Sequence, residues 1–338
     1  AGGELTPRFS PKPQSPIPSP QSPLPNSQSP MRKFIIDTDT ASDDAVALIM
    51  AHHWPDVEIV AVTIVNGNVP VEQGVKNALY TIEVCSASTP VYVGCAKPML
   101  RESRYADWFH GKDGMGNMYY PEAKSKPELA HATDAIIEII KQYPGEITLV
   151  TLGPLTNIAT ALLKAPDIAQ LVQRCVIMGG AANTVGNVTP AAEYNIWVDP
   201  EAAKIVFHSG MPMEMVGWEL SRHDAALTFA EVETVMNFGT DRARLAMECN
   251  KTALDVAMKR QGAVGLTLAD PVAIAVALDP DIVTRQGKYF VDVEITSELT
   301  RGATVVDELG VLNKKPNMNV IWAINVMRWK EILYFCLH

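Results

Sequence analysis

Residues 33–52 read KFIIDTDTASDDAVALIMAH and contain a strand followed at once by a helix. The β-branched run Lys33–Asp37 predicts the strand, and the mostly apolar run Asp44–His52 predicts the helix. Four carboxylates lie within eight residues at the connection between them, where they repel one another and add nothing to packing. A βα unit of this kind indicates an α/β fold, and the acids mark its connection as a candidate site.

The same alternation of short β-branched runs and helical runs continues along the chain. Further strands are predicted at Glu58–Val65, Val91–Gly94, Ile147–Gly153, Cys175–Gly179 and Met213–Gly217. Helices are predicted between them at Gln73–Ser86, Thr133–Gln142, Leu155–Leu163 and Pro200–His208. A mainly helical stretch from Leu220 to Ala277 precedes late strands at Lys288–Ile295, Ala303–Val306 and Asn319–Ile324 and a helix from Val326. This order predicts a doubly wound, mostly parallel mixed sheet with helices on both faces and additional C-terminal helices.

The composition limits the classes of partner. The 338 residues carry a net charge of -10, which argues against nucleic acid or an anionic membrane as the ligand and favours a small molecule. The five cysteines include no CxxC pair, and no apolar run is as long as a membrane span, so we expect a cytoplasmic location. Residues 1–30 hold nine of the 24 prolines and predict a Pro/Ser-rich leader, either disordered or an artificial addition, ahead of a domain over residues 31–338.

The acids of the first connection exceed what a helix start requires. Ser42 or Asp43 could cap the helix, but a cap explains neither Asp37 nor Asp39. Such a density of carboxylates is typical of a site for a hard divalent cation with oxygen ligands. An EF-hand is excluded, because no glycine stands at its sixth position. A phosphatase of the haloacid-dehalogenase kind remains an alternative, since residues 37–41 match its Asp-x-Asp-x-Thr motif except at Ala41.

Several motifs in order resemble one known family. The stretch DTDTASDDAVA (residues 37–47) is similar to the DxDxxxDDxxA signature of the inosine-uridine-preferring nucleoside hydrolases. Four further matches follow it: VTIVNGNV (62–69), HGKDGMG (110–116), GPLTNIA (153–159), and MGGAANTVGNVTPAAEYN (178–195) with DPEAA (199–203). The resemblance implies calcium-dependent hydrolysis of the N-glycosidic bond of ribonucleosides, with release of free base and ribose.

The resemblance also implies roles for individual residues. The carboxylates of Asp39, Asp44 and Asp270 would bind Ca²⁺ together with the backbone carbonyl of Thr156. Asp39 would accept the proton of a water molecule that the metal acidifies, and Asp37 would orient the cluster. Without the resemblance, Asp270 would be read as a helix-capping acid before Pro271. The residues expected to bind ribose are Asp43, Asn68, Met178, Asn187, Glu193 and Asn195.

The side of the leaving base departs from the family pattern. Many members place a histidine directly before the late calcium aspartate, and others use a tryptophan, but here the residue is Ala269. His110 is therefore the catalytic candidate on this side, while Trp108, Tyr119 and Tyr120 could stack on a base. A substitute acid at His223 is less favoured than a solvated helix end. Ala269 leaves open a non-catalytic or weakly active calcium- and ribose-binding homologue. The resemblance further implies a homodimer or homotetramer and a role in nucleoside salvage.

Overall fold

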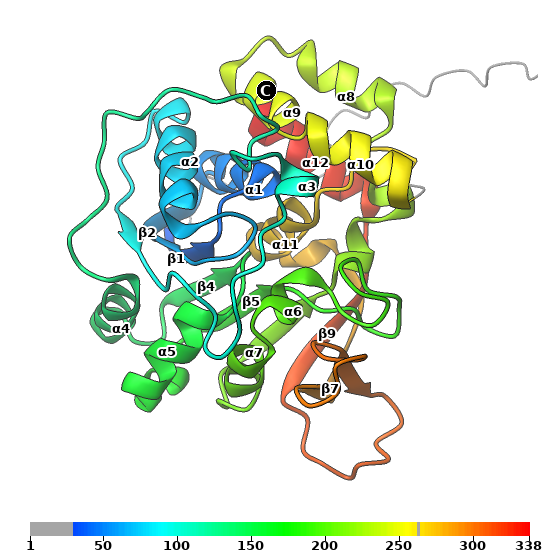
Figure 1. Ribbon diagram of the computed structural model, residues 1–338. Helices are drawn as coiled ribbons and strands as arrows, with labels where there is room; N and C mark the ends of the chain where they lie inside the picture. Colours follow the sequence, from blue (N-terminus) through cyan, green and yellow to red (C-terminus); the bar gives the residue numbers. More distant parts are fainter. Residues whose placement is uncertain (1–29, 262–263) are drawn as a thin grey trace, which may run out of the picture.

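The computed structural model describes residues 30–261 and 264–338. The predicted leader therefore lies outside the described residues except for Pro30. The described chain forms a nine-stranded sheet in the order β3-β2-β1-β4-β5-β6-β9-β7-β8 (Figure 1). The strands are β1 Arg32–Thr38, β2 Val57–Ile64, β3 Val91–Val93, β4 Ile147–Thr151, β5 Arg174–Met178, β6 Met213–Val216, β7 Val283–Val293, β8 Thr304–Asp307 and β9 Met318–Ile324. All neighbouring pairs are parallel except those that β7 makes with β8 and β9.

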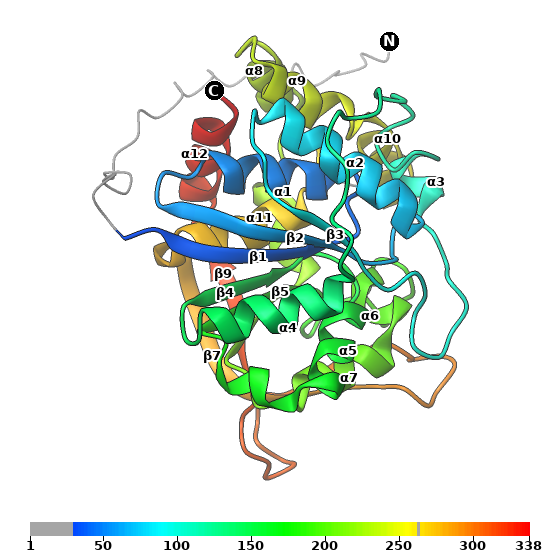
Figure 2. The ribbon, with the colours of Figure 1, turned by 90° about the vertical axis from the view of Figure 1, so that its left-hand side faces the viewer.

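Helices cover both faces of this sheet. On one face lie α1 (Ser42–His53), α2 (Val71–Val84), α11 (Ala269–Leu278) and α12 (Val326–Leu337), and on the other α4 (Ala132–Gln142), α5 (Thr156–Lys164) and α7 (Pro200–Phe207) (Figure 2). The remaining helices are α3 (Asp107–His110), α6 (Tyr194–Val198), α8 (Phe229–Met236), α9 (Asp241–Glu248) and α10 (Lys251–Gln261). The mostly parallel sheet with two helical layers confirms the predicted fold class.

Two apolar cores separate the sheet from its helical layers. The strands contribute buried side chains to both cores, because Phe34 and Ile36 pack on one side and Ile35 on the other. The helix α11 is buried along almost its whole length, from Asp270 to Leu278. A helix apolar on all sides is stable only inside a core, which explains its continuous run of alanine, valine, isoleucine and leucine.

Most element predictions agree with the structure within one or two residues, but the start of β7 does not. The strand begins at Val283, whereas the sequence predicts it from Lys288. Residues 284–286 are exposed, so their polar side chains give no apolar alternation to recognise. The short helices α3 and α6 were not predicted either. In the described part of the chain, no helix has the length and apolar character needed to cross a membrane.

The strand order reverses direction between β1 and β4. The chain builds β1, β2 and β3 outward to one side, then returns to place β4, β5 and β6 on the other side. Open parallel sheets bind ligands beside the carboxyl ends of the strands at such a reversal. The connections after β1 and β4 are therefore the positions where the fold favours a site, and the first of these is the acidic stretch ending at Asp44.

Candidate active site

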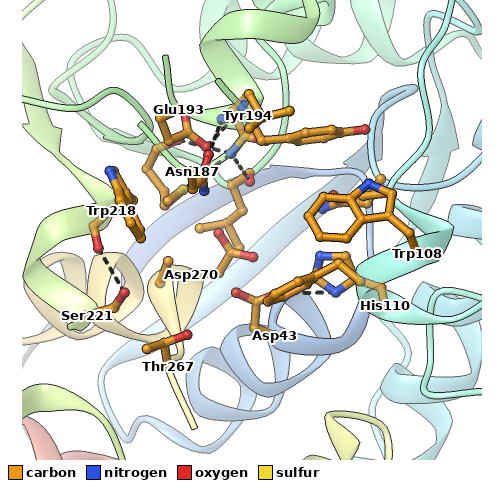
Figure 3. A pocket seen from close by; sticks show the side chains of 18 residues that line it. Asp43, Trp108, His110, Asn187, Glu193, Tyr194, Trp218, Ser221, Thr267 and Asp270 are labelled. Atoms are coloured by element: carbon orange, nitrogen blue, oxygen red, sulfur yellow. Dashed lines mark hydrogen bonds and ion pairs between the residues drawn. The ribbon is translucent and has the colours of Figure 1, made fainter. Parts of the chain in front are cut away.

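A pocket lies at the carboxyl ends of the parallel strands, next to the reversal (Figure 3). All six residues expected to bind ribose line it, namely Asp43, Asn68, Met178, Asn187, Glu193 and Asn195. His110 and Asp270 line it as well. No lysine or arginine is among the described lining residues, so the carboxylates there lack basic partners within the pocket.

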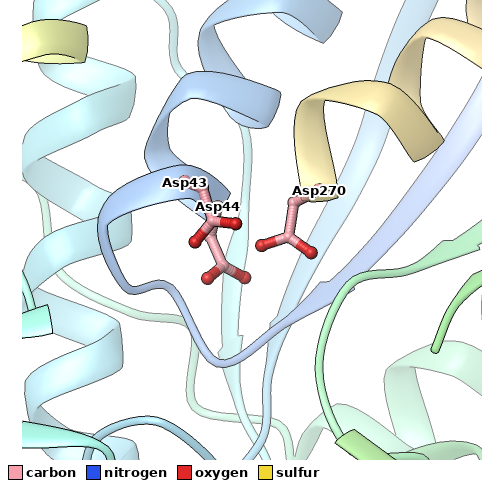
Figure 4. A group of neighbouring side chains, drawn as sticks. All are labelled: Asp43, Asp44 and Asp270. Carbon is pink, nitrogen blue, oxygen red and sulfur yellow. The ribbon is translucent and has the colours of Figure 1, made fainter. Parts of the chain in front are cut away.

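Three acids converge at one end of the pocket. Oxygen atoms of Asp43, Asp44 and Asp270 all lie within 4.8 Å of one another (Figure 4). The first two acids stand in the first turn of α1, and Asp270 stands in the first turn of α11, so two buried helix starts bring them together. Helix amino ends favour negative charge, but only modestly compared with the repulsion of three close carboxylates.

The electrostatics of the cluster favours a cation. Burial, together with the charge of Asp43, raises the pKa of the Asp44 carboxyl group to about 6. Burial and the neighbouring acids Asp43, Asp44 and Asp39 raise the pKa of Asp270 well above its ordinary value. Several oxygen ligands around one point, with no lysine or arginine lining the described pocket, match the preference of a hard divalent cation. The donor set therefore fits Ca²⁺.

Asp39 lies beneath the pocket and does not line it. Its two carboxylate oxygens accept hydrogen bonds from Asn68, one from the backbone N–H at 2.5 Å and one from Nδ2 at 3.2 Å. Burial and then the Asp44 charge raise its pKa well above the ordinary value. A Cβ atom on Gly67 would overlap the Asp39 carboxylate, so glycine is required for the connection after β2 to approach this closely.

Asp37 forms a second layer under the cluster. Its Oδ2 accepts hydrogen bonds from Thr63 Oγ1 at 2.6 Å and from Asn157 Nδ2 at 2.8 Å. Burial raises the pKa of this carboxyl group to about 7, against the opposing effect of the two hydrogen bonds. Asp37 thereby connects β1, β2 and α5 behind the acids, which agrees with the orienting role expected of it.

Thr156, a predicted metal ligand, is not among the residues that line the pocket, and neither are Asp39 and Asp44, which lie beneath it. Thr156 begins α5, where its hydroxyl donates to Asp199 Oδ2 at 2.6 Å and its carbonyl accepts from Thr160 Oγ1 at 2.7 Å. The carbonyl of a first helical residue points along the helix, away from the strand end. The backbone group of this connection that does reach the pocket belongs to Leu152, whose carbonyl accepts from Asn195 Nδ2 at 2.7 Å.

The wall opposite the acids is built around the start of α6. Glu193 caps this helix, and its carboxylate accepts from the backbone N–H groups of Asn195 at 2.8 Å and of Gly180 at 2.9 Å. Burial raises the pKa of Glu193 to about 7, although these hydrogen bonds lower it. The Asn187 Oδ1 accepts from the Tyr194 backbone N–H at 2.9 Å, which fixes the amide at the pocket rim. Amide and carboxyl groups thus face the pocket from a rigid frame.

His110 stands at the end of α3, on the side of the pocket away from Glu193 (Figure 3). Its Nδ1 lies 2.7 Å from Ser42 Oγ and 3.9 Å from Asp43 Oδ1. Burial lowers the pKa of the imidazole, and the charge of Asp43 opposes this effect. The ring is therefore neutral near pH 7 and is tied to the start of α1.

The loop after His110 is organised by Asp113. This buried carboxylate accepts from the backbone N–H groups of Met115, Asn117 and Tyr119 at 2.7–2.8 Å. Asn77 of α2 joins the loop to the aspartate connection, because its Nδ2 donates to the carbonyls of both Asp113 and Thr40 at 2.9 Å. The HGKDGMG motif thus positions His110 through its backbone.

Two expected base contacts are not where the sequence suggested. Tyr120 stacks on Tyr80 at a centroid distance of 4.8 Å, and neither it nor Tyr119 lines the pocket. Trp108, which is 41% exposed, does line it. His223 lies at a separate surface hollow with Thr228, so it does not reach the pocket as a substitute acid.

Other residues of the pocket were missed in the sequence. They are Ala106, Phe109, Leu152, Val188, Tyr194, Trp218, Ser221 and Thr267. Trp218 and Ser221 form one wall, and the Trp218 indole donates to the Val185 carbonyl at 2.8 Å. Trp218 comes directly after Gly217, at the end of a predicted strand, and this position was the signal that could have identified it. Ala269 lies beside these residues and supplies no proton donor.

Comparison with known proteins assigns the chain to a family. A family model described as inosine-uridine preferring nucleoside hydrolase matches residues 34–331. A protein of that name from Leishmania major is 41% identical over 279 residues, which cover 82% of this chain and 88% of the relative. A pyrimidine-specific ribonucleoside hydrolase of Escherichia coli (strain SE11) is 36% identical over 289 residues, which cover 86% of this chain and 91% of the relative.

Solved structures agree with the sequence relatives. A plant nucleoside hydrolase superposes with a TM-score of 0.85 at 32% identity, covering 91% of this chain and 99% of the other. A purine-preferring ribonucleoside hydrolase from Gardnerella vaginalis superposes with a TM-score of 0.84, also at 32% identity, covering 90% of this chain and 98% of the other. The similarity therefore extends over the sheet, its helices and the pocket connections.

Proposed function

The chain belongs to the inosine-uridine preferring nucleoside hydrolase family and is a nucleoside N-ribohydrolase, and we propose that it works with Ca²⁺ held by the acid cluster. It hydrolyses the N-glycosidic bond of ribonucleosides. The observation that carries the proposed metal is the convergence of Asp43, Asp44 and Asp270 within 4.8 Å at one end of the pocket. Family membership over residues 34–331 decides against the phosphatase alternative.

The proposed metal ligands are Asp44 and Asp270 of this cluster together with Asp39, whose carboxyl group is in hydrogen-bond contact with that of Asp44. When bound, calcium would supply positive charge that offsets the repulsion among these carboxylates and makes an adjacent water molecule more acidic. Asp37 supports the cluster from below through Thr63 and Asn157. For the neutral oxygen ligand we propose the backbone carbonyl of Leu152 in place of that of Thr156, because Leu152 lines the pocket and Thr156 does not.

Asp39 is the proposed general base. As the bond between ribose and base breaks, its electron pair leaves with the base, and a water oxygen bonds to the anomeric carbon. The proton that this water loses passes to the Asp39 carboxylate. Asn68 holds both oxygens of that carboxylate, so the orientation of the base is fixed before the substrate binds.

The ribose is proposed to lie among Asp43, Asn68, Asn187, Glu193 and Asn195. Carboxylates and amides from several loops can bond the ribose hydroxyls simultaneously. A sugar that lacks one hydroxyl would leave buried polar groups unpaired, which penalises deoxyribonucleosides. Negative charge on this side also stabilises the positive character that the sugar develops.

The base is proposed to occupy the other side of the pocket, between Trp108 and Trp218. His110 faces this region, and Ala269, which also lines the pocket, has no group that can donate a proton. The relatives include proteins named as purine-preferring and as pyrimidine-specific, so their names do not decide the base preference of this chain.

Release of ribose tests the function and its metal together. The purified protein is assayed with inosine, adenosine, uridine and cytidine, before and after treatment with a calcium-selective chelator. We expect hydrolysis of at least one nucleoside, loss of most activity on chelation, and recovery when Ca²⁺ is added back. Hydrolysis that survives complete removal of calcium would contradict the metal proposal. Absence of hydrolysis with calcium present would instead favour a binding-only homologue, as Ala269 first suggested.

Quaternary structure and cellular setting complete the proposal. A homodimer or homotetramer and a role in nucleoside salvage are proposed from the family resemblance, and a cytoplasmic location from the sequence features described above. Light scattering of the eluted protein tests the assembly, and a monomer at micromolar concentration would contradict it.

A further inference from the structure

Ser42 is a buried hydroxyl that neither the metal proposal nor the ribose proposal uses. It is the first residue of α1, has 0% exposed surface, and directs its Oγ at His110 Nδ1 over 2.7 Å. Its carbonyl is engaged separately, by Asn250 Nδ2 at 3.1 Å. The hydroxyl and the imidazole thus form a hydrogen-bonded pair at the edge of the pocket, and Asp43 Oδ1 lies 3.9 Å from the same Nδ1 without bonding it.

The direction of this hydrogen bond follows from hydrogen-bond satisfaction. If Nδ1 donated its proton to Ser42 Oγ, the serine hydroxyl would need a second group to accept its own proton. Among the described residues, the only hydrogen bond that Ser42 Oγ makes is the one with His110 Nδ1. A buried donor left without an acceptor costs about 1–3 kcal/mol, so the hydroxyl donates to Nδ1 and Nδ1 accepts.

An imidazole that accepts at Nδ1 carries its proton at Nε2. Among the described residues, Nε2 of His110 has no hydrogen-bond partner, although His110 lines the pocket. The Nε2–H group is therefore available to a ligand as a donor. A neutral imidazole can stabilise negative charge that develops on a ligand by donating a hydrogen bond, without transferring a proton.

We propose that Ser42 is a positioning residue that keeps Nδ1 of His110 as the acceptor of its hydroxyl proton, so that the Nε2–H group donates a hydrogen bond to the departing base. The second half of this inference rests on the proposed function, whereas the tautomer does not. Bases that leave with negative charge on a nitrogen or oxygen, as purines and pyrimidines do, would benefit. A p-nitrophenyl leaving group needs no such donor.

Nitrogen NMR of the histidine side chains tests the tautomer directly. The protein is labelled with ¹⁵N-histidine, and His110→Gln assigns the resonance. We expect the wild-type spectrum to show the proton of His110 on Nε2, and Ser42→Ala to shift the ring toward the Nδ1–H form or a mixture. A wild-type ring protonated on Nδ1, or a tautomer unchanged in Ser42→Ala, would overturn the proposal. The wild-type measurement stands even if the variant fails to fold.

Kinetics then test the role of the tautomer. For nucleosides, Ser42→Ala should lower kcat/KM by about 3- to 10-fold, the range expected for one hydrogen bond, while p-nitrophenyl riboside changes less than twofold. Ser42→Thr, which keeps the hydroxyl, should restore the nucleoside rate. Ser209→Ala is the control, because Ser209 lies outside the pocket and, in the described part of the chain, its hydroxyl oxygen bonds only the Met211 backbone N–H. Equal losses on both substrates would indicate a purely structural role and overturn the proposal. If the wild type cleaves no nucleoside, the proposed function fails and the tautomer result remains separate.

Discussion

Asn68 holds Asp39 with two nitrogen atoms, the backbone N–H at 2.5 Å from Oδ2 and the side-chain Nδ2 at 3.2 Å from Oδ1. The contact joins the connection after β2 to the connection after β1, two segments that meet only at the sheet edge. A carboxylate held in this way keeps its orientation before substrate binds, at the expense of mobility. Asn68 also lines the pocket, so one residue links the proposed base to the proposed ribose site.

Substitution of Asp39 tests its proposed role as the general base. Asp39→Asn keeps the shape but cannot accept a proton, and a positioned base contributes about 10²–10⁴-fold to rate. We expect kcat for nucleosides to fall within that range, with calcium content reduced as well. Asp43→Asn is the matched comparison, because Asp43 lines the pocket whereas Asp39 does not. A larger loss of kcat in Asp43→Asn than in Asp39→Asn would indicate that Asp43, not Asp39, is the general base.

Ala269→His places a proton donor where the pocket has none. A natural base departs with developing negative charge, whereas p-nitrophenolate leaves without protonation. The variant should therefore raise kcat for inosine or uridine and leave the rate with p-nitrophenyl riboside nearly unchanged. Wild-type turnover of inosine as fast as that of the nitrophenyl riboside would show that no donor is lacking.

Glu193→Gln tests whether the Glu193 carboxylate both stabilises the start of α6 and binds the ribose. The amide can satisfy fewer of the backbone N–H groups that Glu193 accepts, so the free energy of unfolding should fall by about 1–3 kcal/mol. KM for nucleosides should rise in parallel. Glu233→Gln, at an exposed position on α8, is the control for removal of a negative charge. Thermal unfolding and initial rates measure both effects, and an unchanged KM would exclude Glu193 from ribose binding.

Asp113→Ala should impair activity through the backbone alone. The carboxylate accepts three backbone N–H groups of the loop that follows His110 and does not line the pocket. Removing it leaves these donors without their partner, which should lower stability by about 2–4 kcal/mol and weaken nucleoside hydrolysis. Denaturant unfolding and kcat/KM report the two losses. Full activity in a destabilised variant would show that the loop keeps His110 in place without Asp113.

His52 should contribute to acid sensitivity. Burial lowers the pKa of its imidazole in the folded protein to about 4, against an ordinary value of 6.5, although the Leu48 carbonyl raises it. Between these two values the unfolded chain binds one more proton, so stability falls as the pH falls from about 6.5 to about 4. The contribution is about 3 kcal/mol.

His52→Gln removes this titration. Chemical unfolding at several pH values should show a shallower decline in stability over the same window for the variant than for the wild type. Identical slopes would mean that His52 is already charged in the folded protein. Above pH 7 the difference in the free energy of unfolding between the two proteins should not change with pH.

The sequence predicted the fold well where apolar periodicity was strong. Strands such as β1 and β4 are buried, so their β-branched runs stand out against the neighbouring helices. The prediction missed the first half of β7 because Arg285 and Gln286 are exposed. An exposed antiparallel strand has no run of buried apolar residues to recognise. Its pairing with β9 is a tertiary contact that local sequence does not contain.

The pocket was predicted from the motifs more completely than from the residues. The six expected ribose contacts share the pocket, because each motif follows a strand and parallel strands end at one edge. Thr156 begins α5 and does not line the pocket, so its expected role as a metal ligand stays a prediction. Trp218 and Ser221 are apolar or small residues without a polar cluster to mark them, although Trp218 directly follows a predicted strand, and the fold places them in the same pocket as Trp108.

The convergence of the acids also bears on how the protein is made. Asp43 and Asp44 belong to α1 near the start of the described chain, whereas Asp270 belongs to α11 near its end. On the ribosome, the first two acids emerge long before the third, so a nascent chain cannot complete the cluster until most of the sheet has formed. Tight capture of the proposed Ca²⁺ would therefore be a late event of maturation. Chains released before α11 is synthesised would lack the complete cluster, so retention of the proposed Ca²⁺ would mark molecules that have assembled it.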